Sequence, residues 1–434
     1  MKKYYAREAL LPQGWARDVT IAVDKGDIIE VKLGARGGER LAGPVLPGMA
    51  NLHSHAFQRA MAGLTELRGP GEDDFWTWRE LMYRFVERVT PAQAKAIARH
   101  LYIEMLLHGY TAVAEFDYVH EAEGNLDAAR EAGIAITLLP SLYRWSGFGE
   151  KPLQPRQRRF SSTISDIAKA VSALRSELSR DVAVGVAPHS LRAVDPAALK
   201  EIIGITDGPI HIHAAEQTKE VDECKAALGK RPVEWLLSEM PVDTRWCIVH
   251  ATHMTDEETR ALAASGAVAG LCPSTEGNLG DGIFPLAKYR ASGGRYGIGG
   301  DSHVSRDPAE ELRLLEYFQR VRARKRNIVT SAVSPAVGTS LWLEAAAGGA
   351  QAIGRRMGAI APGLRADLAV LDAQHVDLEG RHGDAVANAL VFSGGSGLVR
   401  DVMVAGRWVV REKRHAGAEE ASAAYKRTLK QLLA

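Results

Sequence analysis

The chain has 434 residues, which suits one large domain with a smaller partner, because a single α/β barrel alone takes about 250 residues or more. Hydrophobic residues make up 46% and charged residues 25%, and 42 glycines with 18 prolines show no low-complexity bias, so disorder, collagen and coiled coil are excluded. Lysine and arginine number 54 against 53 aspartates and glutamates, and this net charge of +1 leaves no overall field to hold nucleic acid or an anionic membrane.

Both ends of the chain carry the pattern of a small β domain. Residues 18–33 (DVTIAVDKGDIIEVKL) alternate hydrophobic and polar side chains around a Lys-Gly-Asp turn, as in a hairpin with one buried face. Residues 366–372 (ADLAVLD) and 400–410 (RDVMVAGRWVV) have the same texture. Because a lone hairpin is marginal in water, we expect the two ends to pair in one small β-sandwich domain made of residues 1–47 and 362–414.

Between Pro47 and Pro362, short hydrophobic runs alternate with longer helical patterns, as in a parallel sheet covered by helices. Eight runs occur: 45–53, 111–118, 134–142, 182–189, 209–215, 246–252, 267–274 and 296–302. Eight strand–helix units favour an α/β fold of the (β/α)8 TIM-like barrel type over 48–361, since a doubly wound nucleotide-binding sheet would carry a GxGxxG motif after its first strand. The last stretch, 415–434, has the composition of a helix.

Two connections of the predicted barrel are long, 57–90 after the first run and 143–160 after the third. Long barrel loops are usually lids or substrate contacts, and simple surface insertions are the alternative. The first interpretation predicts that both loops border the site.

Polar side chains that can bind a metal follow five of the eight predicted strands, at the ends where a barrel places its active site. They are His53, His55, His189, His213 with Glu216, His250 and Asp301. Residues i and i+2 of an extended chain point the same way, so His53 and His55 can face one interior point.

Each of these residues also has a plainer interpretation. An HxH motif can arise by chance, and a buried histidine is more often a hydrogen-bonded core residue. Asp301 could cap the helix that begins near Pro308, although Ser305 and Asp307 lie closer to that helix. The coincidence of the whole set predicts a metal centre.

Four stretches, LPGMANLHSHAFQRAMAGLTE, HIHAAEQ, VHATH and GIGGDSH, resemble the amidohydrolase superfamily, in particular its mononuclear deaminase branch, over essentially the whole chain. By that resemblance Zn²⁺ is the usual metal, and its ligands are His53, His55, His213 and Asp301. The binuclear branch bridges two metals with a carboxylated lysine after the fourth strand, and VAVGVAPHS has no lysine, so we expect one divalent metal per chain. Imidazole and carboxylate ligands suit iron and manganese as well as zinc.

The resemblance also implies the catalytic roles. A divalent cation lowers the pKa of water to near 7, and the resulting hydroxide attacks a C=N carbon. Asp301 would accept the proton of the water, Glu216 would protonate the leaving nitrogen, and His250 would hydrogen-bond the attacking oxygen.

Arg192 follows the fourth predicted strand, where its planar guanidinium would make a good carboxylate clamp, and a structural ion pair with a neighbouring helix is the alternative. Arg79 in FWTWRELMYRF is a second candidate. It competes with Arg68 and Arg84, and packing on a surface helix is the plainer interpretation of such an arginine.

The motifs NLHSHAFQRAMAGL, FWTWRELMYRF, APHSLRAV and DSHVS are most similar to the members of the branch that deiminate N-formimino-L-glutamate in histidine degradation. This resemblance implies a small dicarboxylate as substrate, N-formyl-L-glutamate and ammonia as products, and a homodimer. It assigns substrate contacts to Gln58, Arg79, Tyr118, His189 and Arg192. The alternatives are a deaminase of the same branch that acts on a guanine-like or other nitrogen heterocycle, and a non-catalytic barrel, which we expect to lack several of the metal-site groups.

The cellular compartment follows from two further patterns. Cys224, Cys247 and Cys272 lie far apart, and the last two fall in hydrophobic runs where they resemble small buried side chains. The opening MKKYYAREALLPQGW lacks the continuous hydrophobic stretch of a signal peptide, and no run approaches the ~18 apolar residues of a membrane span. We therefore expect a cytoplasmic protein that has no membrane as partner.

Overall fold

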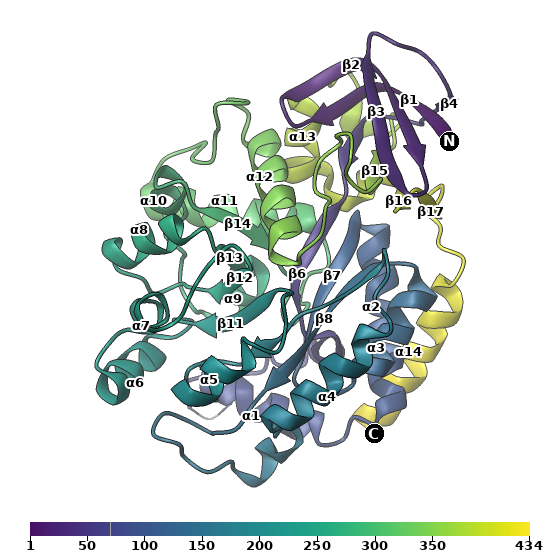
Figure 1. Ribbon diagram of the computed structural model, residues 1–434. Coiled ribbons are helices and arrows are strands. Elements are labelled where there is room, and N and C mark those ends of the chain that lie inside the picture. Colours follow the sequence, from purple (N-terminus) through teal and green to yellow (C-terminus); the bar gives the residue numbers. More distant parts are fainter. Residues whose placement is uncertain (70) are drawn as a thin grey trace.

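A mixed sheet built from both ends of the chain forms one end of the molecule (Figure 1). The computed structural model describes residues 1–69 and 71–434. The eight-stranded sheet has the order β17-β16-β15-β5-β1-β2-β3, and β4 pairs with β1. Its strands are β1 (Lys2–Leu11), β2 (Gly14–Asp24), β3 (Asp27–Leu33), β4 (Glu39–Arg40), β5 (Val45–Pro47), β15 (Leu368–Leu371), β16 (Val399–Val404) and β17 (Arg407–Val410). On this pairing we propose the domain boundaries 1–47 with 362–414, and 48–361.

The small sheet is continuous and curls over its own core. The β2–β3 hairpin turns at Lys25 and Gly26, whose φ angles of 47° and 88° suit the tight turn that matches strand twist. Strand β5 joins the two ends of the chain, since it pairs with β1 on one side and with β15 on the other. Tyr4 on β1 meets Trp408 on β17 edge to face, with ring centroids 5.6 Å apart. The predicted sandwich is thus one folded sheet whose two halves share a hydrophobic cluster.

The eight predicted runs form the strands of a closed parallel barrel in the predicted order, which confirms the fold class. Isolated bridges between Val186 and Ile210 and between Ser54 and Asp301 join the two halves of the barrel. The strands are β6 (Met49–Ser54), β7 (Tyr110–Asp117), β8 (Ala135–Leu142), β9 (Val182–Val184), β10 (Ala187–Pro188), β11 (Ile210–Ala214), β12 (Trp246–His250), β13 (Val268–Leu271) and β14 (Arg295–Ile298).

Two predicted strands are interrupted at glycines. The run 45–53 divides at Gly48 between β5 of the small sheet and β6 of the barrel, and a Cβ on Gly48 would lie 2.5 Å from Thr111 Oγ1. The run 182–189 divides between β9 and β10, where a Cβ on Gly185 would lie 2.2 Å from the carbonyl oxygen of Pro209. At both places a neighbouring segment approaches so closely that only glycine fits.

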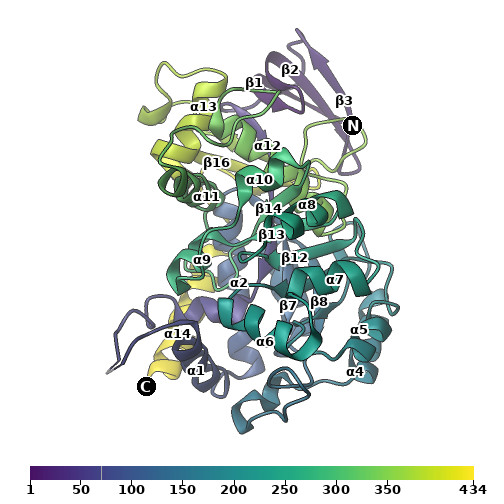
Figure 2. The same cartoon turned by 90° about the vertical axis from the view of Figure 1, so that its left-hand side faces the viewer.

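Helices cover the outside of the barrel (Figure 2). The seventh run ends at Leu271, earlier than predicted, because Pro273 begins a helix there. No helix within the described ranges is long and apolar enough to cross a membrane. The α-helices are α1 (Phe75–Val86), α2 (Pro91–Leu107), α3 (Ala122–Ala132), α4 (Ile164–Arg175), α5 (Pro196–Ile202), α6 (Thr218–Leu228), α7 (Pro232–Glu239), α8 (Asp256–Ser265), α9 (Pro273–Leu279), α10 (Leu286–Ala291), α11 (Pro308–Ala323), α12 (Val337–Ala352), α13 (Asp384–Ala389) and α14 (Ala418–Leu433).

Shorter helical turns lie in the connections. The long loop 57–90 carries η1 (Ala56–Met61) together with α1, and the loop 143–160 carries η2 (Pro155–Phe160). The others are η3 (Val376–Leu378), η4 (Leu390–Gly394) and η5 (Gly395–Leu398). The small sheet and α1 lie at opposite ends of the molecule (Figure 1 and Figure 2), so α1 belongs to the end at which the barrel strands terminate.

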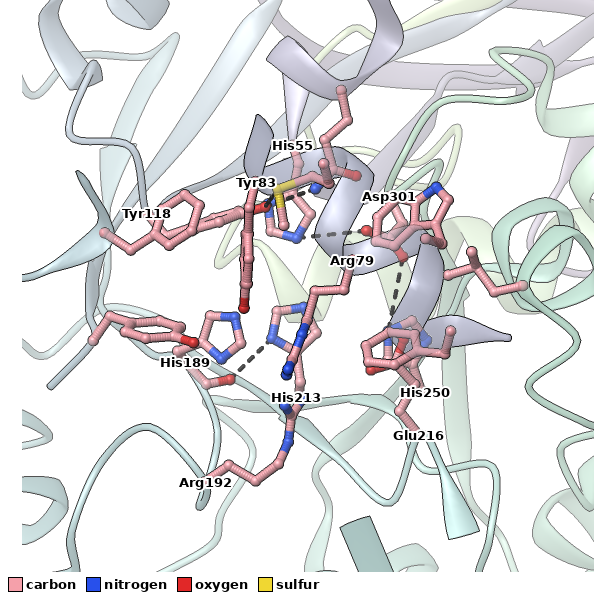
Figure 3. Close-up of a pocket in the computed structure, with 17 residues that line it drawn as sticks. His55, Arg79, Tyr83, Tyr118, His189, Arg192, His213, Glu216, His250 and Asp301 are labelled. Carbon is pink, nitrogen blue, oxygen red and sulfur yellow. Dashed lines mark hydrogen bonds and ion pairs between the residues drawn. The ribbon is translucent and has the colours of Figure 1, made fainter. Parts of the chain in front are cut away.

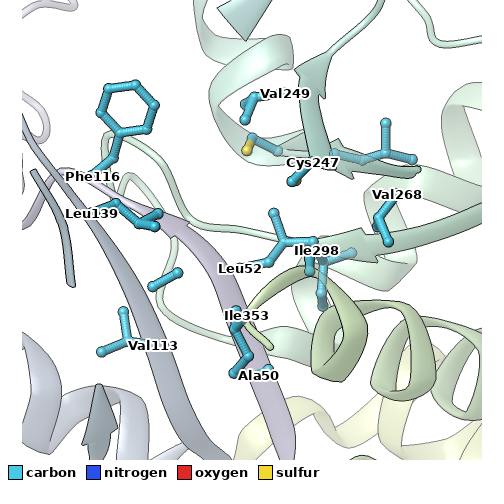
Figure 4. Close-up of a cluster of buried hydrophobic side chains, with 14 of the residues drawn as sticks. Ala50, Leu52, Val113, Phe116, Leu139, Cys247, Val249, Val268, Ile298 and Ile353 are labelled. Atoms are coloured by element: carbon cyan, nitrogen blue, oxygen red, sulfur yellow. The ribbon is translucent and has the colours of Figure 1, made fainter. Parts of the chain in front are cut away.

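Hydrophobic side chains fill the barrel between its strands (Figure 4). Leu52 on β6 is fully buried beneath the metal-capable His53, and Val113, Leu139 and Cys247 are buried with it. The barrel is therefore a packed core rather than a pore, and its polar groups gather at the carboxyl ends of the strands.

The C-terminal helix α14 docks along α2. Tyr425 stacks on His100 of α2 with ring centroids 4.5 Å apart, and its hydroxyl donates to the carbonyl oxygen of Arg59 at 3.3 Å. Arg59 in turn donates to the carbonyl oxygen of His303 at 2.7 Å. Helix α14 thus contacts the segment that carries η1 at Arg59, and Arg59 in turn contacts the loop after β14 at His303.

Candidate active site

Four side chains meet at the carboxyl ends of the barrel strands. His53 and His55 belong to β6 and the residue after it, His213 belongs to β11, and Asp301 lies in the loop after β14. His213 Nε2 lies 3.1 Å from His53 Nε2, and Asp301 Oδ1 lies 3.6 Å from His53 Nε2 and 3.5 Å from His55 Nε2. The fold thus brings together the four residues that the family resemblance predicts as metal ligands.

The outer nitrogens of two of these histidines face carbonyl groups. His55 Nδ1 lies 3.1 Å from Phe116 O, and His213 Nδ1 lies 2.9 Å from His189 O. Because a carbonyl oxygen only accepts, Nδ1 carries the hydrogen in both rings and Nε2 presents a lone pair. Burial lowers the pKa of His55 to about 3 and that of His213 well below its usual range. Converging neutral nitrogens beside a carboxylate oxygen fit a divalent cation such as Zn²⁺.

The backbone is strained at two of the strand ends that supply the site. His250 has φ 67° and Asp301 has φ 50°, in the left-handed region that residues with a Cβ rarely adopt. Such strain costs of order 1–3 kcal/mol per residue and clusters at functional sites. Asp301 does not cap the following helix, because Asp307 caps α11 and accepts the N–H of Ala309 at 2.8 Å.

Glu216 and His250 face each other beside the ligand set (Figure 3). His250 Nε2 lies 3.6 Å from Glu216 Oε1 and 3.8 Å from Asp301 Oδ2. Burial raises the pKa of Glu216 to about 7, so both of its protonation states are populated near neutral pH. Burial opposes a charge on His250, but the surrounding carboxylates, that of Glu216 first, outweigh it and raise the pKa of His250 to about 10. The pair can therefore exchange protons with a bound molecule.

Three buried carboxyl groups beside Glu216 and His250 were not predicted from the sequence. Glu276 Oε1 lies 3.3 Å from His250 Nδ1, and Glu220 Oε2 accepts the peptide N–H of Glu216 at 3.1 Å. Asp281 lies with Glu216 and His250 in a group whose ligand atoms are within 4.8 Å of one another. Burial, and then the charge of Glu216, raises the pKa of Asp281 to about 10. Glu276 follows the seventh predicted strand, where the barrel rule could have found it, whereas Glu220 and Asp281 carry no such signal.

The predicted substrate contacts line the same pocket as His55, His213 and Asp301 of the ligand set. Gln58 Nε2 donates to the hydroxyl of Tyr118 at 2.7 Å, and Gln58 Oε1 is buried without a hydrogen-bond partner among the described residues. His189 is half-buried, and its ring centroid lies 4.8 Å from that of His213. Both long loops border the pocket, since α1 supplies Arg79 and the loop 143–160 supplies Phe160.

Arg79 and Arg192 enter the pocket from different elements (Figure 3). Their Cζ atoms lie 4.5 Å and 5.6 Å from the ring centre of Trp76. In the part of the chain that the structure describes, the Nε atoms of both arginines are buried without a hydrogen-bond partner. Burial opposes the charge on Arg192, but the carboxylates of Glu220 and then Glu216 outweigh it and raise its pKa. Both guanidinium groups are thus free to bind a ligand.

The structure also separates Arg79 from its two competitors. Arg84 is exposed, although it lies on the same helix α1, and Arg68 donates to the carbonyl oxygen of Gly71 in an exposed loop. Neither lines the pocket that holds the metal-ligand set.

This barrel and site define an amidohydrolase, and comparison with known proteins agrees. A model of the amidohydrolase family matches residues 45–409, and a model of the N-terminal domain of formimidoylglutamate deiminase HutF matches residues 1–42. The chain belongs to the amidohydrolase family, which confirms the resemblance read from its motifs.

The individual relatives are similar over full length. Formimidoylglutamate deiminase from Pseudomonas aeruginosa is 52% identical, with 100% of each chain covered. The crystal structure of an amidohydrolase from Brucella melitensis superposes with a TM-score of 0.95 at 44% identity and covers 100% of both chains. An adenosine deaminase from Xanthomonas campestris with bound zinc has a TM-score of 0.85 at 20% identity, with 99% and 98% covered, and shares the fold.

Proposed function

We propose that the chain hydrolyses formimidoylglutamate (N-formimino-L-glutamate) to N-formyl-L-glutamate and ammonia, a step of histidine degradation. The observation that carries this proposal is a pocket in which three of the four proposed metal ligands, His55, His213 and Asp301, lie with two arginines. The Nε atoms of both arginines are unpartnered among the described residues. The substrate has two carboxylates and one C=N carbon, so the pocket offers a matching group for each. The 52% identity to a relative of that name supports the same assignment.

We assign one divalent cation per chain, Zn²⁺, to His53, His55, His213 and Asp301. When bound, such a cation lowers the pKa of water to near 7 and makes hydroxide available at neutral pH. The fourth strand has no lysine to bridge a second cation, which supports a single one.

The chain's own residues then move the protons. Asp301 accepts the proton that the attacking water loses. His250 hydrogen-bonds the attacking oxygen, since its Nε2 lies 3.8 Å from Asp301 Oδ2 and its ring centroid lies 5.6 Å from that of His213. Glu216 gives a proton to the terminal nitrogen of the formimino group, because ammonia leaves only when that nitrogen is protonated. Asp301 then passes its proton to the same nitrogen, and the bond between carbon and the terminal nitrogen breaks. The added hydroxyl returns its remaining proton to Glu216, so the former C=N carbon becomes the carbonyl of the formyl group and, in net terms, both hydrogens of the water leave on ammonia.

The remaining pocket residues hold the substrate. Arg192 and Arg79 each bind a carboxylate, since a guanidinium can give two parallel hydrogen bonds to one carboxylate. The unpartnered Oε1 of Gln58 accepts a hydrogen from the formimino group, and Tyr118 fixes the Gln58 amide. His189 packs beside His213 and completes the wall next to Arg192.

We further propose a cytoplasmic homodimer. Its partner is a small dicarboxylate substrate, and neither nucleic acid nor a membrane is a partner, which agrees with a net charge of +1.

The test is ammonia release by the purified, metal-loaded protein. We expect turnover of N-formimino-L-glutamate, and a kcat/KM about 10–100-fold lower for N-formiminoglycine, which lacks the side-chain carboxylate and so loses one charge-assisted contact of about 1.5–3 kcal/mol. A panel of guanine-like rings serves as the comparison. Activity confined to the rings would overturn the proposal in favour of a heterocycle deaminase.

A further inference from the structure

The ring of His250 is held from behind by a buried glutamate. Glu276 is 3% exposed, and its Oε1 lies 3.3 Å from His250 Nδ1. The same oxygen accepts the peptide N–H of Cys272 at 2.9 Å. The opposite ring nitrogen, Nε2, faces Glu216 and Asp301. Glu276 therefore touches His250 on the side away from the reacting groups.

The helix that carries Glu276 is itself anchored to the catalytic end of the barrel. Thr275 Oγ1 donates to the carbonyl oxygen of Gly300 at 3.0 Å, directly before Asp301. Ser274 donates through its hydroxyl and its peptide N–H to the carboxylate of Glu311, at 2.6 Å and 2.8 Å. Three consecutive residues of α9 thus contact α11, the Asp301 loop and His250 in turn. These contacts hold α9 in place, so the carboxylate of Glu276 has a defined position.

We infer that Glu276 is a positioning residue for the deimination, because its carboxylate receives the Nδ1–H of His250 and thereby keeps Nε2 directed at the reacting molecule. This inference rests on the proposed function. A carboxylate accepts but does not donate, so Nδ1 must carry a hydrogen toward Glu276, and this bond fixes the rotation of the ring. Without Glu276, a buried Nδ1–H would lose its partner at a residue whose backbone is already strained at φ 67°.

The groups around His250 explain why this contact acts on turnover rather than on binding. Glu216 and Asp301 lie on the Nε2 side, Glu276 lies on the Nδ1 side, and Asp281 belongs to the same buried group. Glu276 is not among the residues that line the pocket, whereas Glu216, His250 and Asp301 are. Loss of Glu276 should therefore lower kcat and leave the substrate contacts in place.

The experiment is a double-mutant cycle with Glu276→Gln, His250→Asn and the double variant. We expect Glu276→Gln to lower kcat about 10–100-fold, as loss of an orienting partner typically does, with KM changed less than about 3-fold and metal content unchanged. In the His250→Asn background the same substitution should cost less than about 2-fold. Glu258→Gln, which neutralises another buried glutamate on α8, is the matched control and should keep full activity.

A second readout is independent of turnover. In protein labelled with ¹⁵N-histidine, the ring proton that disappears in His250→Asn should resonate downfield in the wild type and move upfield in Glu276→Gln. If Glu276→Gln does not fold, Glu276→Asp, which withdraws the carboxylate by one methylene, enters the same cycle and the same spectrum.

Three results would overturn the inference: wild-type kcat in the Glu276 variant, an equal loss of kcat in both His250 backgrounds, or an unchanged His250 ring-proton resonance in that variant. If the wild type did not deiminate formimidoylglutamate, the proposed function would fail, while the spectrum would still report whether Glu276 holds His250.

Discussion

The pH dependence of turnover follows from the burial of Glu216. This side chain is 5% exposed, and burial raises its pKa from an ordinary 4.5 to about 7. At pH 7 about half of the carboxyl groups then carry a proton, whereas at an unshifted pKa about 0.3% would, so burial increases the acid form roughly 150-fold. The same shift corresponds to about 3 kcal/mol between the two protonation states.

The sign of the effect follows from the role of the proton. The protonated carboxyl is the form that serves the leaving nitrogen, so the part of the kcat profile that Glu216 sets should fall as pH rises through about 7. The assay is steady-state ammonia release at saturating substrate from pH 5.5 to 9. The Glu216→Gln side chain cannot deliver a proton, so this variant should lower kcat at least about 100-fold. Its kcat should no longer fall as pH rises through about 7, and its metal content should match that of the wild type.

Two outcomes would refute the reasoning. A wild-type profile without a falling limb near pH 7 would show that the acid is another group. A Glu216→Gln variant that retains more than about a tenth of kcat would show that no side-chain acid is needed at this position.

Three further predictions concern the metal, the substrate and the fold. His55→Ala should lose most of the bound metal, measured by elemental analysis of dialysed protein, and retention of a full equivalent would contradict the ligand set. Arg192→Ala should lower kcat/KM about 10–100-fold with metal still bound, whereas Arg84→Ala, on the exposed side of α1, should match the wild type in the same kinetics. Gly348→Ala should destabilise the fold by about 1–3 kcal/mol, seen as a lower Tm, because its Cβ would meet the carbonyl oxygen of Tyr296 at 1.8 Å; Gly397→Ala, which faces open space, is the control.

The sequence pattern predicts those features of the fold that depend on residues close together in the chain, such as the strands and their ends. The run WCIVH is hydrophobic because β12 is buried on both faces, and its final His250 marks the strand end where a barrel places polar groups. His53 and His55 could likewise be paired from their spacing alone. The interruptions at Gly48 and Gly185 could not be predicted, since they depend on which distant atoms approach each glycine, the Thr111 side chain at Gly48 and the Pro209 carbonyl at Gly185.

The same limit applies to the site. Glu276 follows the strand next to β12, and the barrel order could have placed it near His250. Its contact with the His250 ring depends on how α9 turns after that strand, which no local pattern reports. The choice of Arg79 over Arg84 depends on which face of α1 turns toward the strand ends. Tertiary packing, rather than propensity, decides both.

The joining of both chain ends in one sheet has a consequence for biosynthesis. Strand β5 emerges from the ribosome early, but its partner β15 follows only after the whole barrel has been translated, which takes roughly 15–65 s at common elongation rates. During that interval the edge of β5 that later pairs with β15 is exposed and can pair with another nascent chain. Translation speed and chaperone supply should therefore govern the yield of native protein more strongly for this chain than for a barrel without such a terminal sheet.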